Sequence, residues 1–289
     1  MRQLAILSGK GGTGKTTLTA AFSVLAGKIV VADCDVDAPD LHMLLHPEII
    51  KRNEFKGSKL AQIDQTKCIK CGLCREKCRF NAIIENIEVD QYSCEGCGVC
   101  TIVCPVNAAR LIERISGQVY TSKINYGFMV HATLNPGEAN SGKLVALVRL
   151  NAKIIAEKEG LDLILIDGPP GIGCPVIASV TGIDAALIVT EPTLSGIHDL
   201  ERVVQLLEHF KIQPLVCVNM YDVNKNNTEK ILAFCKERSI EVVGMIPFNP
   251  KVTEAMVKGK TIVEYSPGSD VTNEIRCIWE KVTVVLNQK

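Results

Sequence analysis

The sequence lacks a surplus of charge of either sign, since 32 basic residues balance 32 acidic ones. A chain without a basic field has no general attraction for nucleic acid or for an anionic membrane surface. It also lacks an apolar run approaching the ~18 residues of a membrane-spanning helix, and it shows no charged-then-apolar leader. We therefore expect a cytoplasmic protein with neither a nucleic-acid nor a membrane partner.

Cysteine, in contrast, is abundant, with thirteen residues. In a chain without a secretion signal, this number indicates metal ligation rather than disulfides. The length of 289 residues and the hydrophobic content of 47 % suffice for one large α/β domain and a small second one. The five histidines are scattered and receive no chemical role.

The segment from Gly9 to Thr17 reads GKGGTGKTT and follows the apolar run Leu4–Leu7. It fits the phosphate-binding pattern G-x-x-x-x-G-K-[ST] between a strand and a helix. Glycines let successive backbone N–H groups point into one concavity, and the helix N-terminus adds its positive dipole end. The alternative is a glycine-rich turn without a ligand. The predicted nucleotide-binding residues of this loop are Gly9, Lys10, Gly11, Gly12, Thr13, Gly14, Lys15, Thr16 and Thr17.

Two side chains of the loop have predicted chemical roles. Lys15 is expected to reach the β- and γ-phosphates, and the Thr16 hydroxyl is expected to ligate Mg²⁺. Because Lys10 precedes the glycine pair, the loop resembles the deviant loop of the MinD/ParA/Mrp family of ATPases, which includes the nitrogenase iron protein. The resemblance implies ATP and ADP as nucleotides, and a nucleotide-dependent homodimer in which Lys10 reaches across to the other subunit's nucleotide. A solvated loop lysine is the alternative.

Carboxylates follow two further predicted strands, Ile29–Asp33 and Leu161–Ile166. At the carboxyl end of a strand beside the phosphate loop, they can hold Mg²⁺-bound water or orient the attacking water. By resemblance, Asp35 matches the water-activating aspartate of the first switch, with Asp37 or Asp40 as its companion. Helix capping is the alternative.

Asp167 opens the segment DGPPG, which looks like the second switch of the Mrp-type members. By this resemblance, Asp167 is expected to hold Mg²⁺ through water, as a Walker B aspartate does. The N–H group of Gly171 is expected to sense the γ-phosphate. A strand-terminal turn is the alternative. Lys10, Lys15, Asp35 and Asp167 are thus the predicted catalytic residues, and the predicted Mg²⁺ site comprises Thr16, Asp35 and Asp167.

The predicted base pocket lies at the ends of two later strands. Asn219 follows Leu215–Val218 and resembles the family's adenine-binding residue, although a turn-forming asparagine is the alternative. The segment from Pro247 to Asn249 is expected to form the other wall through its backbone groups.

Two cysteine quartets share the spacing C-x2-C-x2-C-x3-C at an offset of 26 residues, which also maps Asp64 onto Asp90 and Asn81 onto Asn107. The segment is therefore an internal duplication. The spacing is that of the bacterial two-cluster ferredoxin, in which the fourth cysteine of each run ligates the other cluster. We assign one [4Fe–4S] cluster to Cys68, Cys71, Cys74 and Cys104, and the other to Cys94, Cys97, Cys100 and Cys78. The alternative is tetrahedral zinc held by C-x2-C pairs. Neither the third cysteine of each run nor the repeated spacing suits such a site.

The predicted fold is α/β: a doubly wound, mainly parallel sheet of the P-loop NTPase type with a small α+β ferredoxin-like insertion. Residues 1–58 and 116–289 form the two parts of the ATPase domain, and residues 59–115 form the insertion. The last helix, about Val271–Leu286, has no basic face and is expected to pack against the sheet rather than a membrane.

Cys174 stands where the nitrogenase iron protein has a cysteine that helps bridge its dimer. Asn140 stands in place of the second bridging cysteine, and one ligand per subunit cannot make an all-cysteine bridge. We therefore expect Cys174 to be a small buried residue rather than a cluster ligand.

Together, these motifs predict an ATP-hydrolysing iron–sulfur protein. Its nucleotide state is coupled to electron transfer or to the assembly of an iron–sulfur or metal cofactor, with a redox or cofactor-assembly protein as partner. The alternative is a positioning or scaffold ATPase whose clusters are structural or sense redox state.

Overall fold

The computed structural model describes residues 1–138 and 140–288. Ala139 and Lys289, which fall within the predicted second part of the ATPase domain, lie outside the described residues. The chain divides into two compact units. Unit 1 comprises Met1–Arg52, Val119–Thr133 and Ser141–Lys289, and unit 2 comprises Asn53–Gln118 and Leu134–Asn140.

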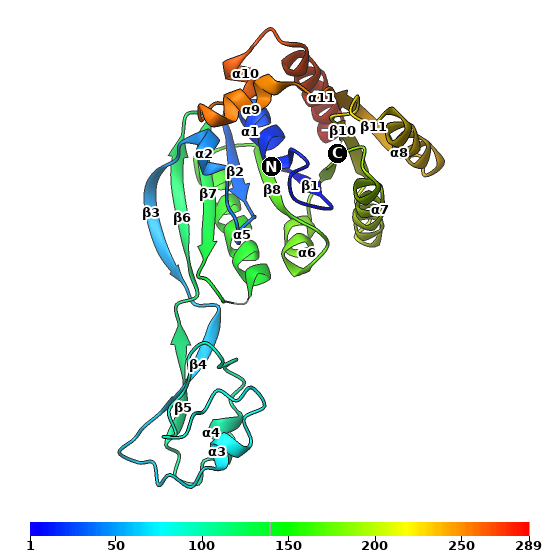
Figure 1. Ribbon diagram of the computed structural model, residues 1–289. Helices are drawn as coiled ribbons and strands as arrows, with labels where there is room; N and C mark the ends of the chain where they lie inside the picture. The colour runs from blue at the N-terminus through cyan, green and yellow to red at the C-terminus, as the bar shows by residue number, and fades with distance from the viewer. Residues whose placement is uncertain (139, 289) are drawn as a thin grey trace. The chain divides into compact units, whose positions relative to one another are not determined.

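Within the described residues, nine strands form one sheet in the order β11-β10-β9-β1-β8-β2-β7-β6-β3 (Figure 1). Parallel pairs join β1 to β8 and β9, β2 to β7 and β8, and β10 to β9 and β11. The mainly parallel α/β sheet predicted from the sequence is thereby confirmed. The strands are β1 (Arg2–Ser8), β2 (Ile29–Asp33), β3 (Glu48–Phe55), β6 (Gly117–Ile124), β7 (Gly127–Leu134), β8 (Leu163–Pro170), β9 (Ala185–Thr190), β10 (Pro214–Asn219) and β11 (Glu241–Ile246).

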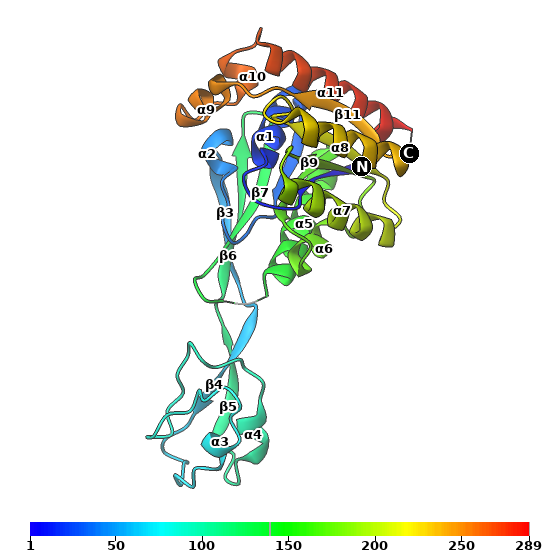
Figure 2. The ribbon, with the colours of Figure 1, turned by 45° about the vertical axis from the view of Figure 1, so that its right-hand side comes forward.

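Helices cover both faces of this sheet (Figures 1 and 2). On one face α1 packs on β1, β2 and β8, while α11 packs on β9 and β11. On the other face α5 and α6 pack on β8, and α7 packs on β1, β9 and β10. The helices of unit 1 are α1 (Lys15–Ala26), α2 (His42–Leu45), α5 (Ser141–Glu159), α6 (Cys174–Val180), α7 (Leu194–His209), α8 (Lys225–Glu237), α9 (Pro250–Val257), α10 (Ile262–Tyr265) and α11 (Asp270–Asn287).

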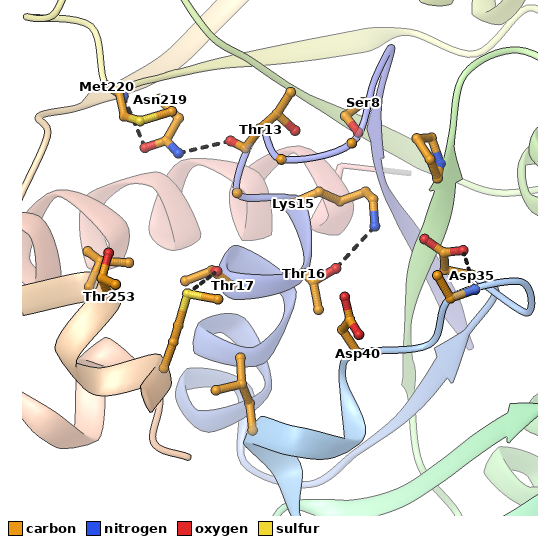
Figure 3. Close-up of a pocket in the computed structure, with 18 of the residues that line it drawn as sticks. Ser8, Thr13, Lys15, Thr16, Thr17, Asp35, Asp40, Asn219, Met220 and Thr253 are labelled. Atoms are coloured by element: carbon orange, nitrogen blue, oxygen red, sulfur yellow. Dashed lines mark hydrogen bonds between the residues drawn. The ribbon is translucent and has the colours of Figure 1, made fainter. Parts of the chain in front are cut away.

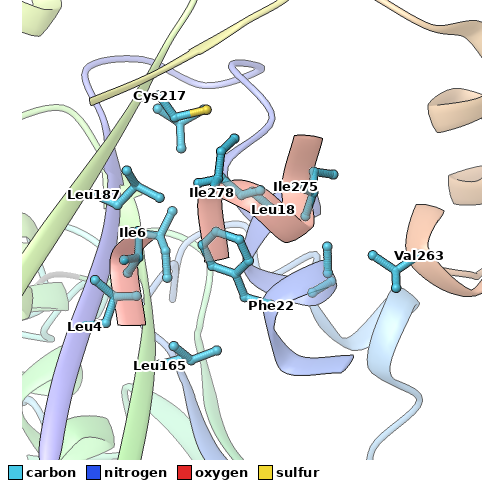
Figure 4. Close-up of a cluster of buried hydrophobic side chains, with 14 of the residues drawn as sticks. Leu4, Ile6, Leu18, Phe22, Leu165, Leu187, Cys217, Val263, Ile275 and Ile278 are labelled. Atoms are coloured by element: carbon cyan, nitrogen blue, oxygen red, sulfur yellow. The ribbon is translucent and has the colours of Figure 1, made fainter. Parts of the chain in front are cut away.

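The core between α1, α11 and the sheet explains why the last helix packs inward, as predicted. Its apolar stripe, which includes Ile275 and Ile278, is buried against Phe22 of α1 and the inward residues of the central strands (Figure 4). The single tryptophan, Trp279, lies at the edge of this core, with its ring centroid 4.9 Å from that of Phe22. Burial of these side chains positions α1, and with it the loop that precedes α1.

One predicted strand differs from the structure in its bounds. The run Leu161–Ile166 was expected to end before Asp167, but β8 covers Leu163–Pro170, so Asp167 lies inside the strand. β1 remains paired with β8 beyond Asp167, as far as Ser8↔Pro170, after an irregularity between Ile6 and Ser8. Gly168 packs closely on β1, since a Cβ at that position would lie 2.5 Å from Leu7 Cδ2.

Unit 2 contains a two-stranded antiparallel sheet, β4 (Ser58–Ile63) with β5 (Ala109–Arg114), in the register Ser58↔Arg114 to Ile63↔Ala109. Two short helices, α3 (Leu73–Glu76) and α4 (Val99–Val103), each follow a glycine in the left-handed region. A small apolar cluster that includes Ala61, Ile83 and Ile87 packs against cysteines from both quartets. Cysteine side chains thus form part of the core of this unit.

Acidification is expected to destabilise the fold through His131 of β7. Its Nε2 lies 3.1 Å from Ser122 Oγ, and its ring stacks on Tyr120 at 4.9 Å. Burial, with a smaller contribution from the charge of His42, lowers the pKa of His131 to about 4. The unfolded chain, with a histidine pKa near 6.5, binds the proton first. The free energy of unfolding therefore falls as the pH drops from about 6.5 to about 4, by about 2–3 kcal/mol in total.

Urea unfolding at pH 7 and pH 4.5, followed by circular dichroism, measures this loss. A His131→Gln variant should show a smaller decrease between the two pH values, whereas His209→Gln, at an exposed position, should behave like the wild type. Burial also raises the pKa of Asp33, which acts in the opposite direction in all three proteins and cancels in the comparison. Equal pH dependence of wild type and His131→Gln would contradict the prediction.

Candidate functional site

A pocket of about 750 Å³ lies in unit 1 at the carboxyl ends of the parallel strands. Ser8 ends β1, Asp35 follows β2, Asn219 ends β10, and Pro247 follows β11, and all four line the pocket. This volume falls within the range of about 300–1,000 Å³ that is usual for small-molecule sites. The carboxyl ends of a parallel sheet are also where such folds place their ligands.

The glycine-rich loop forms one wall of this pocket (Figure 3). Gly14 precedes α1 with φ 92°, and a Cβ there would lie 2.4 Å from Asn219 Nδ2, so both conformation and space require glycine. Gly9 does not line the pocket. A Cβ on Gly9 would lie 2.2 Å from Asp199 Cβ, so this glycine serves the close packing of the loop on α7. The predicted loop residues that line the pocket are Gly11, Gly12, Thr13, Gly14, Lys15, Thr16 and Thr17.

The buried Lys15 and Asp167 and the half-buried Thr16 form a polar cluster at the base of the loop. The Asp167 carboxylate accepts from Lys15 Nζ at 3.1 Å and from the Thr16 hydroxyl at 2.9 Å. It also accepts from Thr19 at 2.9 Å, a residue that the sequence analysis missed and that lies one helical turn after Lys15. Burial opposes the charge on Lys15, but the neighbouring carboxylates, with Asp167 contributing most, together outweigh burial and raise the pKa of Lys15.

Two aspartates from the end of β2 lie next to this cluster. Asp33 is buried, and one of its carboxylate oxygens has no hydrogen-bond partner within the described residues. Burial and then the Asp167 charge raise the pKa of Asp33 well above its usual range. Burial also raises the pKa of Asp35, against the opposing effect of Lys15. Asp35 lines the pocket, as do both of its possible companions, Asp37 and Asp40.

Lys10 does not line the pocket, and its ammonium group is bound on the adjacent surface. Its Nζ lies 2.6 Å from Glu191 Oε1, 2.9 Å from Ser195 Oγ and 3.2 Å from Thr193 Oγ1. The Lys10 side chain is 31 % exposed. The structure thus does not bring Lys10 together with Lys15, Asp35 and Asp167.

Asn219 lies beside Thr13, at the end of the pocket away from Asp35 (Figure 3). Its Nδ2 donates to the Thr13 carbonyl at 2.9 Å, and its Oδ1 accepts from the Met220 N–H at 3.0 Å. An asparagine amide has two N–H donors and an acceptor oxygen with two lone pairs. One donor and one lone pair therefore remain for a base in the pocket.

The wall opposite Asn219 contains residues that the sequence analysis missed. Pro247 and Asn249 line the pocket as expected, and they are joined by Val252, Thr253 and Met256 of α9. Asn249 caps α9 by accepting from Lys251, and Pro250 occupies the first turn. This asparagine–proline start, with apolar residues four apart at 252 and 256, is the signal that would have placed a helix face here.

Gly171, which was predicted to sense the γ-phosphate, does not line the pocket, whereas Pro169 and Pro170 do. Its N–H donates to the Ser8 carbonyl at 3.0 Å. Cys174 is exposed, so the prediction of a small buried residue is wrong. It begins the short helix α6, whose buried residues are Val176, Ser179 and Val180.

The eight clustered cysteines of unit 2 line two separate cavities. One is lined by Cys68, Cys71 and Cys74 of the first run together with Cys104 of the second. The other is lined by Cys94, Cys97 and Cys100 of the second run together with Cys78 of the first. The structure therefore brings together the two sets of four that the sequence spacing predicted. Within the described residues, no three His, Cys, Asp or Glu side chains are close enough to hold one metal ion.

Hydrogen bonds relate the two halves of this segment by a repeat of the same contacts. The Asp64 N–H donates to the Ala108 carbonyl, and the Asp90 N–H donates to the Ala82 carbonyl, both at 2.8 Å. Ala108 lies four positions after Cys104, and Ala82 lies four positions after Cys78. Each half thus donates a hydrogen bond to a residue just after the fourth cysteine of the other half. This exchange places each fourth cysteine beside the opposite run.

A parallel sheet with a glycine-rich loop before its first helix and buried carboxylates beside Lys15 and Thr16 defines a P-loop ATPase. The chain belongs to the family of the CobQ/CobB/MinD/ParA nucleotide-binding domain, which matches residues 4–262. It is a MinD/ParA-type member, and ATP hydrolysis is the activity of this class.

The chain is also similar to other proteins along nearly its whole length. The chain is 32 % identical to the uncharacterised protein MJ0578 of Methanocaldococcus jannaschii over 283 residues, which cover 97 % of this chain and 96 % of that protein. It is 25 % identical to an iron–sulfur cluster carrier protein of Aquifex aeolicus, over 99 % of this chain and 68 % of that protein.

Solved structures share the fold. The septum site-determining protein MinD of Pyrococcus horikoshii, complexed with Mg-ADP, superposes with a TM-score of 0.61 at 20 % identity. The match covers 97 % of this chain and 95 % of that one. Across the part of the chain that the structure describes, no helix combines the length and the apolar character needed to cross a bilayer.

Proposed function

We propose that this protein is an ATP-hydrolysing iron–sulfur protein that couples its nucleotide state to electron transfer or to the assembly of an iron–sulfur or metal cofactor. The observation that carries the proposal is the pair of cavities in unit 2, each lined by three cysteines of one run and the fourth cysteine of the other. In this proposal, residues 59–115, which lie within unit 2, form a ferredoxin-like insertion that holds two [4Fe–4S] clusters.

The donor set fits such clusters better than it fits zinc. Four thiolates per cavity are the usual ligands of a [4Fe–4S] cluster, which carries electrons over a wide range of potentials. A single zinc ion draws four ligands to about 2.0–2.3 Å, whereas a cubane keeps its thiolates farther apart, one on each iron. The absence of any three-ligand group at single-ion spacing among the described residues is consistent with the larger unit.

In the nucleotide pocket, we assign the loop N–H groups and Lys15 to the phosphates, and Thr16 and Asp167 to Mg²⁺, which supplies charge neutralisation when bound. The contact of 2.9 Å between Thr16 and Asp167 supports this pairing, since both oxygens face the same point. Asp35 orients the attacking water from the pocket wall. Asn219 and the backbone at Pro247 bind adenine.

A redox titration of the anaerobically reconstituted protein, followed by EPR with and without ATP, tests the coupling. We expect two signals of [4Fe–4S] type and a midpoint potential that shifts by about 60 mV or more with ATP, since 59 mV corresponds to a tenfold change for one electron. A nucleotide can change the potential only through contacts that differ between the bound states. Potentials and transfer rates that are indifferent to ATP would contradict the proposal.

Replacing Lys10 by alanine is expected to leave ATP binding within about threefold of wild type and to lower turnover about 10²–10³-fold. In the proposed nucleotide-dependent homodimer, Lys10 leaves Glu191 and places its charge on the other subunit's phosphates, where one such donor is worth that factor. Phosphate release and light scattering with ATP measure turnover and dimerisation. Ser195→Ala, which removes only a neutral partner of Lys10, is the control. Wild-type turnover of Lys10→Ala would exclude a role in trans.

A second candidate function has its own observation. The chain is 26 % identical to a putative septum site-determining protein MinD of Mesostigma viride over 91 % of its length, which favours a positioning ATPase whose clusters are structural or redox-sensing. ATP-dependent sedimentation with liposomes or DNA would support this function. Our proposal instead predicts no ATP-dependent sedimentation with either liposomes or DNA. It predicts an ATP-dependent change in the potential of the clusters.

A further inference from the structure

The two halves of the cysteine segment share a backbone but differ in their charges. Gly72 and Gly98 have φ 79° and 82°, and Asn81 and Asn107 have φ 52° and 51°. Residues 67–79 carry five basic residues and one acidic residue, whereas the matching residues 93–105 carry one acidic residue and no basic one. The same local fold therefore forms without these basic side chains, and packing does not explain their presence.

Lys70 provides the clearest case. It lies in the left-handed region at φ 53°, and its counterpart Gly96 has φ 64°. Glycine adopts this conformation freely, whereas a residue with a Cβ is strained in it. Gly96 is also required by space, because a Cβ there would lie 2.1 Å from the Lys59 carbonyl oxygen. The first half thus retains a lysine at a position where the backbone favours glycine.

The first half is also the more exposed one around its cavity. Leu73 is 40 % exposed, while its counterpart Val99 is half-buried, and Cys74 is half-buried, while its counterpart Cys100 is buried. Ile69, which lines the cavity of Cys68, Cys71, Cys74 and Cys104, is 61 % exposed. Apolar side chains surrounded by charged ones are typical of a protein contact surface.

We propose that the basic face, by which we mean the exposed basic residues Lys67, Lys70, Arg75 and Lys77 together with the exposed Ile69 and Leu73 of the same segment, docks an acidic one-electron carrier protein. This inference rests on the proposed function, and it names the cavity of Cys68, Cys71, Cys74 and Cys104 as the place where electrons cross to a partner. One electron leaves the reduced carrier, which is oxidised by one electron, and enters the cluster, which is reduced by one. No bond forms and no proton moves.

The charges of the basic face are available for such a partner. Lys67, Arg75 and Lys77 lie 3.5, 3.7 and 2.7 Å from acidic neighbours, but these pairs are exposed and contribute little to stability. Within residues 67–79 the basic residues outnumber the acidic one by five to one. This local excess of positive charge would attract an acidic partner to the basic face as it approaches.

The exposed apolar residues favour a protein over a nucleic acid. The side chains of Ile69 and Leu73 within the basic face offer neither hydrogen-bond donors for phosphate nor aromatic rings for base stacking. The chain as a whole has no net positive charge to attract a polyanion. An acidic protein with an apolar centre satisfies both parts of the face.

The test uses the full-length reconstituted protein and a strongly acidic flavodoxin as the probe. The variant Lys67→Ser/Lys70→Gly/Arg75→Thr introduces the residues found at the matching positions 93, 96 and 101, where the same backbone accepts them. The control, Lys153→Ser/Lys158→Ser/Lys236→Ser, removes the same charge from exposed positions of unit 1. Stopped-flow absorbance follows electron transfer from reduced flavodoxin, and calorimetry measures the binding of oxidised flavodoxin.

At low salt, we expect the variant to bind oxidised flavodoxin about tenfold more weakly than wild type. We also expect it to accept electrons from reduced flavodoxin about tenfold more slowly. The control should match wild type in both measurements. At about 0.5 M salt the three proteins should converge, because steering between opposite charges is screened. Reduction by dithionite, a small anion, should differ by less than about threefold, and the midpoint potentials should agree.

Three outcomes would overturn the proposal: equal flavodoxin kinetics in wild type and variant, tighter binding of a DNA duplex than of flavodoxin to wild type, or a shifted potential that accounts for the slower rate. Iron content and EPR of the same samples separate this failure from failure of the proposed function. Samples without [4Fe–4S] signals would overturn both, whereas intact clusters with kinetics independent of the basic face would overturn the docking alone.

Discussion

Lys15→Ala is expected to abolish ATP hydrolysis, with a loss of at least about 10³-fold, and to weaken ATP binding. The Lys15 ammonium group is the charge of the loop that lies between the pocket and Asp167. Catalysis of phosphoryl transfer depends almost entirely on positioning and charge stabilisation, so removal of this cation removes most of what the site supplies. Phosphate release and the binding of a labelled ATP analogue measure the two effects.

Stability must be separated from chemistry in this experiment. Lys15 and Asp167 are both almost fully buried, and removing one member of a buried pair costs about 3–5 kcal/mol by leaving an uncompensated charge. Lys15→Met combined with Asp167→Asn leaves no net charge behind and should fold while remaining inactive. Lys28→Ala, at an exposed position near the end of α1, is the matched control and should retain full activity. Hydrolysis by a folded Lys15→Met/Asp167→Asn protein at a wild-type rate would exclude the assigned role.

Paired cysteine substitutions are expected to distinguish crossed from uncrossed clusters by iron content. In the crossed arrangement, Cys78 and Cys94 line the same cavity, whereas Cys68 belongs to the other one. The Cys78→Ala/Cys94→Ala protein should therefore keep one cluster of the two, with about four of eight iron atoms. The Cys68→Ala/Cys78→Ala protein should lose both clusters. An uncrossed arrangement predicts the reverse result for the two proteins.

Cysteines outside the two cavities supply the control. Cys277 is exposed and lies on α11, so Cys277→Ala combined with Cys174→Ala changes the same number of thiols without touching either quartet. This protein should retain about eight iron atoms and both EPR signals. If it loses iron as the quartet variants do, the assignment of the clusters to unit 2 is wrong.

The parts of the site that the sequence predicted are those in which chemistry requires a residue type at a fixed spacing. The loop from Gly11 to Thr17 and the carboxylate of Asp35 all line the pocket, because a phosphate cradle at a strand end leaves little freedom. The two cavities of unit 2 likewise contain the two predicted sets of four cysteines, since the repeat fixes which thiols can meet.

Other contacts depend on tertiary packing that a local pattern does not contain. Met256 reaches the pocket only because α9 lies beside α1, where the Thr17 hydroxyl contacts its sulfur at 3.6 Å. The exposure of Cys174 depends on the neighbours of α6, and a cysteine beside apolar residues in sequence carries no sign of that exposure. The continuation of β8 past Asp167 depends on its pairing with β1, which extends as far as Ser8↔Pro170.

The contact between Phe22 and Trp279 gives this protein a built-in optical reporter. Phe22 lies on the helix that the glycine-rich loop leads into, and Trp279 is the single indole of the chain. Any displacement of that helix when a nucleotide occupies the loop changes the surroundings of the indole ring. Selective excitation of Trp279 therefore allows nucleotide association to be timed without a label, and an emission change absent from Lys15→Ala would assign the signal to the phosphate site.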